Sequence, residues 1–211
     1  MSTCLVGSEM CIRDSPYTQM KTAALPIPIK KAKGTVLYAE DGKEYIDAVS
    51  SWWLNIHGHA HPYIAKKVYE QMLELEHVIF AGFTHEPAVT LAERLLKILP
   101  SKQKKFFFSD NGSTAVEVGL KMAFQYWYNK DIKRTKVIAF KDAYHGDTFG
   151  AMAVSGRSVF TAPFNPFLFD VVFIDAPTPT KIESSKQQLA EILENDDVAC
   201  FIFEPLIQGA G

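Results

Sequence analysis

Residues 105–140 read KFFFSDNGSTAVEVGLKMAFQYWYNKDIKRTKVIAF, and this stretch decides the fold. Residues 105–108 and 137–140 are short apolar runs of the length expected for buried strands. Between them, residues 113–128 carry apolar side chains at helical spacing. A strand, a helix and a second strand in this order predict a right-handed crossover within a largely parallel sheet. The apolar face of the expected helix consists of Val116, Leu120, Ala123, Phe124 and Trp127.

The same alternation continues toward the C-terminal end of the sequence. Residues 171–174 and 198–203 are further apolar runs that predict strands, and residues 184–193 predict a helix between them. Short buried strands separated by helices are typical of an α/β fold, in which helices cover both faces of the sheet.

Toward the N-terminal end the pattern changes. Residues 34–38 and 43–47 alternate apolar and polar side chains around an Asp-Gly pair at 41–42, which predicts a β-hairpin. Apolar residues at helical spacing, each series with a proline in its first turn, predict helices over residues 62–75 and 87–100.

Composition excludes several classes of function. The chain has 211 residues, a formal net charge of −2, and 47% hydrophobic residues. This length allows a sizeable core without disulfides, and the balanced charge gives no electrostatic case for binding nucleic acid or an anionic membrane. No apolar run approaches the roughly 20 residues of a membrane-spanning helix. The three cysteines form no disulfide framework, so we expect a reducing, cytoplasmic setting.

Residues 109–114, SDNGST, form the turn between the first expected strand and its helix. Ligands collect at the carboxyl ends of parallel strands, and free backbone N–H groups, hydroxyls and the positive end of a helix dipole suit a phosphate. The alternative is that Ser113 or Thr114 only caps the helix, with Glu117 completing a capping box. Neither a P-loop nor a GxGxxG motif is present.

Residues 144–148, YHGDT, follow the next expected strand. A strand-end loop that carries an aromatic ring, an imidazole and a carboxylate is typical of a ligand site. The alternative is a turn in which Asp147 caps a following short helix and Tyr144 packs locally. Glu204, at the end of the last expected strand, could be catalytic, structural or simply the first loop residue.

Two aromatic groups near the hairpin leave alternatives open. His57, His59 and His61 alternate and could face one side to hold zinc, but the intervening glycine and the helix start favour a tight connection, and we predict no metal. Trp52 and Trp53 could both belong to the core. If they lie in a strand, adjacent side chains point oppositely, and one of them could face a ligand.

The two ends of the sequence differ from the rest. Residues 1–15, MSTCLVGSEMCIRDS, have no helical, strand or signal-peptide pattern, and we interpret them as a non-native or disordered leader. Residues 204–211, EPLIQGAG, end within a Gly-rich turn directly after an apolar strand. We therefore expect the sequence to stop short of the end of a domain.

Taken together, the motifs resemble the class III pyridoxal-phosphate aminotransferases, and the likeness runs from Pro16 to Gly211. It rests on GHAHP at 58–62, GS at 112–113, YHG at 144–146 and EPLIQG at 204–209. Three further blocks narrow it to the branch that moves an amino group from S-adenosylmethionine to 8-amino-7-oxononanoate in biotin biosynthesis. They are PYTQM at 16–20, SSWW at 50–53, and KMA with QYW at 121–127.

The resemblance implies the fold type I architecture of pyridoxal-phosphate enzymes, with a mostly parallel sheet, helices on both faces and part of a small α+β domain. It places residues 16–65 in that small domain and residues 66–211 in the first half of the large cofactor-binding domain, with the C-terminal half absent. It also implies pyridoxal 5'-phosphate as cofactor, small-molecule substrates and a homodimer when full length.

Site residues carry over position by position. The resemblance implies that Gly112 and Ser113 hold the cofactor phosphate and that Tyr144 lies against the pyridine ring and borders the substrate. It groups Glu204 with the cofactor-binding residues. For the oxononanoate pocket it implies Tyr17 and Trp52, with Trp53 as a neighbour.

Two departures from the family pattern matter. The family's Schiff-base lysine and the aspartate that pairs with the pyridine nitrogen lie beyond residue 211, so we assign no catalytic residue here and expect this chain alone to be inactive. Asp14 and Ser15 stand where the family usually has Trp-His, which supports a foreign leader. Two alternatives remain: another class III ω-aminotransferase, acting on ornithine or 4-aminobutyrate-like amines, or a non-catalytic binding or dimerisation module.

Overall fold

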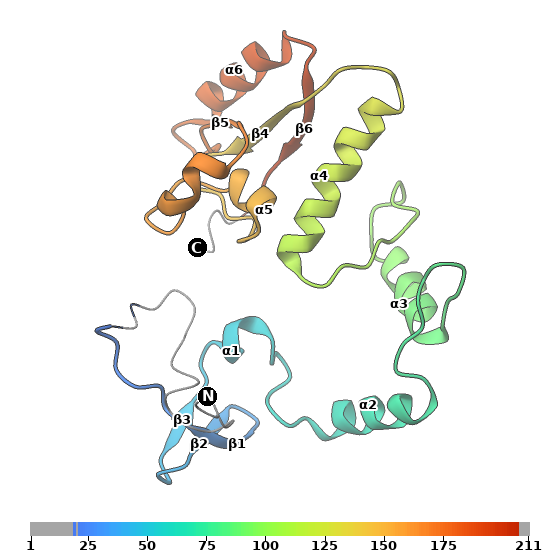
Figure 1. The fold of residues 1–211 in the computed structure, drawn as a ribbon, viewed down its shortest axis with the longest axis vertical. Coiled ribbons are helices and arrows are strands. Elements are labelled where there is room, and N and C mark those ends of the chain that lie inside the picture. The colour runs from blue at the N-terminus through green and yellow to red at the C-terminus, as the bar shows by residue number, and fades with distance from the viewer. Residues whose placement is uncertain (1–18, 20, 207–211) are drawn as a thin grey trace, which may run out of the picture. The chain divides into compact units, whose positions relative to one another are not determined.

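The computed structural model describes residue 19 and residues 21–206, so the leader and Tyr17 lie outside the described residues. The chain divides into two compact units, Met1–Lys104 and Lys105–Gly211, called here the N-terminal and C-terminal units (Figure 1). This division does not coincide with the boundary near residue 66 expected between the two domains of the complete protein, which stays a prediction.

The N-terminal unit contains a three-stranded antiparallel sheet. Strands β2 (Val36–Ala39) and β3 (Glu44–Ile46) form the predicted hairpin, in which Leu37 lies opposite Tyr45. Strand β1 (Ile29–Lys33) adds to the other edge of β2 and was not predicted, because its sequence IKKAK lacks the apolar alternation of a half-buried strand.

Three helices follow the hairpin. Helix α1 (Ser50–Trp53) is a single irregular turn, whereas α2 (Pro62–Glu74) and α3 (Glu86–Leu96) are the two predicted helices. Both have a proline in the first turn, where its missing N–H costs no helical hydrogen bond. The predicted end of the second helix near residue 100 was too late by one turn.

The C-terminal unit is built on a parallel sheet in the order β5-β4-β6. Strand β4 (Lys136–Phe140) lies between β5 (Val172–Ile174) and β6 (Val198–Ile202), and all three were predicted. Helix α4 (Gly112–Tyr128) leads into β4, and α6 (Ile182–Leu193) connects β5 to β6. Figure 1 shows α4 and α6 on either side of the sheet, as expected for crossover helices.

The core follows the alternation of side chains along β4. Ile138 and Phe140 face one side, where Leu189 and Ile192 of α6 pack against their cluster. Val137 and Ala139 face the other side, and there the apolar face of α4 covers them. The predicted two-sided burial of a parallel strand is therefore confirmed: Val137, Ile138 and Ala139 have no exposed surface.

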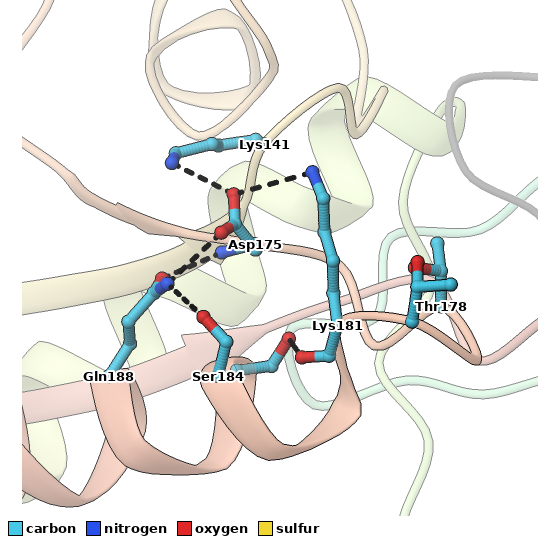
Figure 2. Close-up of polar contacts among 8 residues, drawn as sticks. Lys141, Asp175, Thr178, Lys181, Ser184 and Gln188 are labelled. Atoms are coloured by element: carbon cyan, nitrogen blue, oxygen red, sulfur yellow. Dashed lines mark hydrogen bonds and ion pairs between the residues drawn. The ribbon is translucent and has the colours of Figure 1, made fainter.

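A polar network fixes α6 to the carboxyl end of β5 (Figure 2). The backbone N–H of Asp175 donates to Gln188 Oε1, and Gln188 Nε2 donates to Asp175 Oδ2, both at 3.0 Å. Lys141, directly after β4, reaches Asp175 Oδ1 at 2.8 Å, and its contact lowers the pKa of that carboxyl. The network joins the ends of two strands and a helix, in addition to the apolar packing of α6 on the sheet.

One predicted strand is not formed. Residues 105–108 are irregular, and Phe107 and Phe108 are 65% and 44% exposed. An apolar run becomes a strand only when a neighbouring strand takes its backbone hydrogen bonds, and none of the strands in the described part of the chain pairs with it.

Candidate active site

The turn before α4 is closed by a capping box that the sequence did not predict. Asn111 is the N-cap: its Oδ1 accepts the N–H of Thr114, and Thr114 Oγ1 accepts the N–H of Asn111, both at 3.0 Å. The alternative in which Ser113 or Thr114 is the N-cap and Glu117 completes the box is therefore wrong. Because Asn111 caps the helix, the Ser113 hydroxyl is not used for capping.

Gly112 and Ser113 leave their donors available at this helix end. Their backbone N–H groups donate to no acceptor among the described residues, and a Cβ on Gly112 would meet no atom within 4 Å. Ser113 Oγ accepts the N–H of Asp147 at 3.1 Å, so its own hydrogen remains free to donate. Two amides, a hydroxyl and the positive end of a 17-residue helix suit an anionic group.

The loop after β4 lies directly on this helix end. Gly146 has φ +129°, a conformation that side chains rarely adopt, and a Cβ there would come to 2.2 Å from Ser113 Oγ. Only glycine allows the loop to approach so closely. The contact places the YHGDT loop beside the SDNGST turn, although 34 residues separate Ser113 from Asp147.

Tyr144 and Glu204 meet in the same place. The Tyr144 hydroxyl donates to Asp147 Oδ2 at 2.6 Å, and the Tyr144 backbone N–H donates to Glu204 Oε2 at 3.0 Å. Asp147 thus does not cap the following helix α5 (Phe149–Ala153), whose N-cap is Thr148. The sequence left the role of Glu204 undecided. In the structure it follows β6 and accepts a hydrogen bond from the backbone of Tyr144.

His145 is held within the same loop. Its backbone N–H donates to Ser155 Oγ at 2.9 Å, whereas its Nε2 is buried without a partner among the described residues. Burial lowers the pKa of the imidazole, although the nearby charge of Glu204 opposes this shift. The ring is therefore neutral near pH 7.

Glu117 has a role at the site other than the capping-box role considered for it from the sequence. Its Oε1 accepts the N–H groups of Gly150 at 2.7 Å and Ala151 at 3.3 Å, the second and third residues of α5. A Cβ on Gly150 would lie 2.2 Å from Glu117 Oε2. The available signal was a carboxylate beside the apolar positions Val116 and Leu120 of α4, which is an unusual place for an unpaired charge.

The candidate aromatic pair of the N-terminal unit does not lie in a strand. Ser50, Ser51, Trp52 and Trp53 form α1 with φ between +48° and +66°, which makes it a left-handed turn. Trp52 and Trp53 are 62% and 70% exposed, so they are not core residues.

His57, His59 and His61 do not converge on one point. His59 Nε2 lies 2.8 Å from Asp47 Oδ2, and the rings of His57 and His61 are 6.2 Å apart. The described residues contain no group of three side chains placed to hold a metal ion. Nor does any helix within residues 21–206 combine the length and the apolar character needed to cross a membrane.

The structure therefore brings four of the seven expected site residues together in the C-terminal unit: Gly112, Ser113, Tyr144 and Glu204. Trp52 and Trp53 belong to the N-terminal unit, and Tyr17 lies outside the described residues. A helix N-terminus and an aromatic ring beside the carboxyl ends of β4 and β6 are typical of the class of parallel α/β proteins that bind phosphorylated cofactors.

The comparisons identify the family. A family model described as aminotransferase class III matches residues 17–211, so the chain belongs to the class III aminotransferases, which are pyridoxal-phosphate-dependent transaminases. Among relatives, the adenosylmethionine-8-amino-7-oxononanoate aminotransferase of Synechococcus elongatus is 52% identical over 204 residues, or 93% of this chain and 48% of that protein. The enzyme of the same name from Staphylococcus aureus is 37% identical over 92% of this chain and 47% of that protein.

A solved structure gives the same result for the fold. The crystal structure of adenosylmethionine-8-amino-7-oxononanoate aminotransferase from Methanocaldococcus jannaschii superposes with a TM-score of 0.80 at 35% identity, covering 89% of this chain and 43% of that one. The predicted fold type I architecture is thereby confirmed. The chain spans about half the length of the curated relatives it matches.

Proposed function

We propose that the complete protein transfers an amino group from S-adenosylmethionine to 8-amino-7-oxononanoate, forming 7,8-diaminononanoate in biotin biosynthesis. The observation that carries this proposal is the 52% identity to a relative that bears the name of this activity. The arrangement of Ser113, Tyr144 and Glu204 supports it, because these residues form one connected site in this chain.

The residues present fit pyridoxal 5'-phosphate. The amides of Gly112 and Ser113 and the Ser113 hydroxyl would bind the phosphate, and the exposed face of Tyr144, a residue that is 47% exposed, would lie against the pyridine ring. When bound, the cofactor supplies an electron sink for the transfer of the amino group. The chain's own contribution is orientation: Glu204 and Asp147 fix Tyr144, and Glu117 fixes the helix behind it.

The substrate residues form a second part of the proposal. Tyr17 and Trp52, with Trp53 beside them, would line the pocket for the aliphatic chain of the acceptor, since aromatic faces bind long apolar groups. Tyr144 would border both cofactor and substrate. For the complete protein we also propose a homodimer, a cytoplasmic location, and a small domain that contains residues 16–65 followed by a large domain from residue 66.

We further propose that the 211-residue chain alone is inactive. Covalent catalysis by this family needs a lysine nucleophile, and none of the lysines of this chain lies in the sequence context that the family uses. With cofactor and both substrates present, we expect no formation of 7,8-diaminononanoate above background. Turnover by the isolated chain would overturn this expectation.

The absorbance of the complete protein tests the function. With pyridoxal phosphate bound, S-adenosylmethionine alone should convert the cofactor to its aminated form, and 8-amino-7-oxononanoate should reverse the change. Conversion by ornithine or 4-aminobutyrate but not by S-adenosylmethionine would favour another ω-aminotransferase. If the complete protein binds the cofactor but no amino donor converts it to the aminated form, a non-catalytic binding module would be favoured.

A further inference from the structure

Asp47 connects several segments of the N-terminal unit. Its side chain is only 6% exposed, and it follows β3 directly. Its Oδ1 accepts the backbone N–H of Ser51 at 2.9 Å, and its Oδ2 accepts the Ser51 hydroxyl at 2.7 Å. His59 Nε2 lies 2.8 Å from the same Oδ2. These contacts, those from Ser51 first, lower the pKa of Asp47 to about 2, so the carboxylate is charged at neutral pH.

The carboxylate is held by backbone contacts on both sides. Asp47 N–H donates to the carbonyl of Thr35 at 2.9 Å. His59 exchanges two backbone hydrogen bonds with Gly34, at 2.8 and 3.0 Å. Gly58 has φ +82°, and a Cβ there would lie 3.0 Å from the Cα of Gly34, so glycine allows this close approach. Asp47 and His59 are therefore fixed to the same end of β2.

The segment that Asp47 holds is strained. The four residues of α1 all have left-handed backbone angles, and none is glycine. Such a conformation costs about 1–2 kcal/mol per residue, so it persists only where surrounding contacts enforce it. Ser51, within the turn, donates both hydrogen bonds to the Asp47 carboxylate. The carboxylate thus stabilises the turn from its centre.

The strained turn also presents the two adjacent indoles. Trp52 and Trp53 are 62% and 70% exposed, although buried aromatic side chains would stabilise the unit more. Strained backbone that is over-determined by neighbouring contacts and carries exposed aromatic side chains is typical of ligand-binding segments.

We infer, resting on the proposed function, that Asp47 is a positioning residue for the amino acceptor: through Ser51 it holds the left-handed turn at residues 50–53 and so presents Trp52 and Trp53 to a medium-length aliphatic keto acid. Asp47 itself does not touch the substrate in this account. We expect its effect to fall on the acceptor, whereas under the proposed function the phosphate and ring contacts of the cofactor would be made by residues of the other unit.

The test uses the complete protein with Asp47→Asn and Ser51→Ala, each of which removes part of the carboxylate–turn contact. We expect the KM for 8-amino-7-oxononanoate to rise roughly tenfold, the loss expected for a hydrogen bond to a charged group. Cofactor content and the rate of the half-reaction with S-adenosylmethionine should stay within twofold. Asp41→Asn is the matched control, because Asp41 also accepts a backbone N–H, from Lys43 at 3.1 Å, but in an exposed loop.

A second readout does not depend on activity. The complete protein is labelled with 5-fluorotryptophan, and the ¹⁹F resonances of Trp52 and Trp53 are assigned by their loss in Trp52→Phe and Trp53→Phe. Asp47→Asn and Ser51→Ala should shift both resonances, whereas Asp41→Asn should leave them in place and none of the three should move Trp127.

The outcomes separate the inference from the function on which it rests. Unmoved resonances, an unchanged KM for the acceptor, or an equal loss in both half-reactions would overturn the positioning role. If the unsubstituted protein does not react with this acceptor at all, the proposed function fails, and the ¹⁹F resonances still decide whether Asp47 holds the turn.

Discussion

Two turns of this molecule carry candidate site residues, and they are stabilised in different ways. The turn at residues 109–114 begins a 17-residue helix that packs on the parallel sheet, and a capping box closes it. The turn at residues 50–53 has left-handed backbone angles and depends on side-chain contacts from Asp47. We therefore expect the loss of one polar contact to change the geometry of the irregular turn more than that of the regular turn.

Gly146→Ala should produce the largest effect at the regular turn, because there the limit is steric. A Cβ would overlap the Ser113 hydroxyl, and φ +129° is unfavourable for alanine. The combined cost of about 3 kcal/mol corresponds to a roughly 100-fold loss of cofactor affinity, measured by titrating the complete apoprotein with pyridoxal phosphate.

Gly42→Ala is the control for this substitution. Gly42 also has a positive φ, of +85°, but a Cβ there would meet nothing within 4 Å. It should lower stability slightly and leave cofactor affinity unchanged. An equal loss of affinity in both variants would show that backbone strain, and not the close approach to Ser113, is responsible.

Glu117→Ala should have the next largest effect, because it leaves the N–H groups of Gly150 and Ala151 without an acceptor. Removing the acceptor of two partly buried donors costs about 1–3 kcal/mol, measured by denaturant unfolding of the complete protein. Glu183→Ala is the control, since Glu183 forms only an exposed ion pair with Lys186. A loss that is no larger than that of the control would contradict the bracing role of Glu117.

The sequence predicted the parts of the fold that depend on local pattern. The strands around Ile138 and the helix that begins at Gly112 follow from apolar spacing, and the neighbouring glycine and hydroxyl residues indicated an anion site. The strand at 105–108 was wrong, because a strand also needs a neighbour. The contact of Glu117 with α5 was missed because its partners lie 33 and 34 residues further along the chain.

The irregular turn lay beyond the reach of sequence patterns. Four consecutive residues with positive φ contradict the local preference of serine and tryptophan. The contacts that stabilise their conformation come from Asp47. The Asp47 carboxylate is in turn contacted by His59, which lies twelve residues further along the chain. A motif match placed Trp52 and Trp53 in a site but gave no conformation for them.

Asn111→Ala should have a smaller effect than Glu117→Ala, because regular structure remains around the cap. Loss of an N-cap side chain costs about 1 kcal/mol, so a small fall in stability is expected in denaturant unfolding. Thr148→Ala is the comparison: Thr148 is the N-cap of α5, but its side chain makes no capping hydrogen bond. A fall as large for Thr148 as for Asn111 would argue against the capping box as the stabilising feature.

Acid should weaken the irregular turn before the regular one. The pKa of Asp47 is lowered from 3.8 to about 2 by Ser51 and His59, so its contribution to stability is fully present above pH 3.8 and is lost as the pH falls toward 2. The difference in unfolding free energy between the unsubstituted protein and Asp47→Asn should therefore be constant above about pH 5 and shrink below pH 3.8. The cap at Asn111 carries no titrating group, so the corresponding difference for Asn111→Ala should not change over this range. A difference for Asp47→Asn that stayed constant down to the acid limit of folding would mean that the charge of Asp47 does not hold the turn.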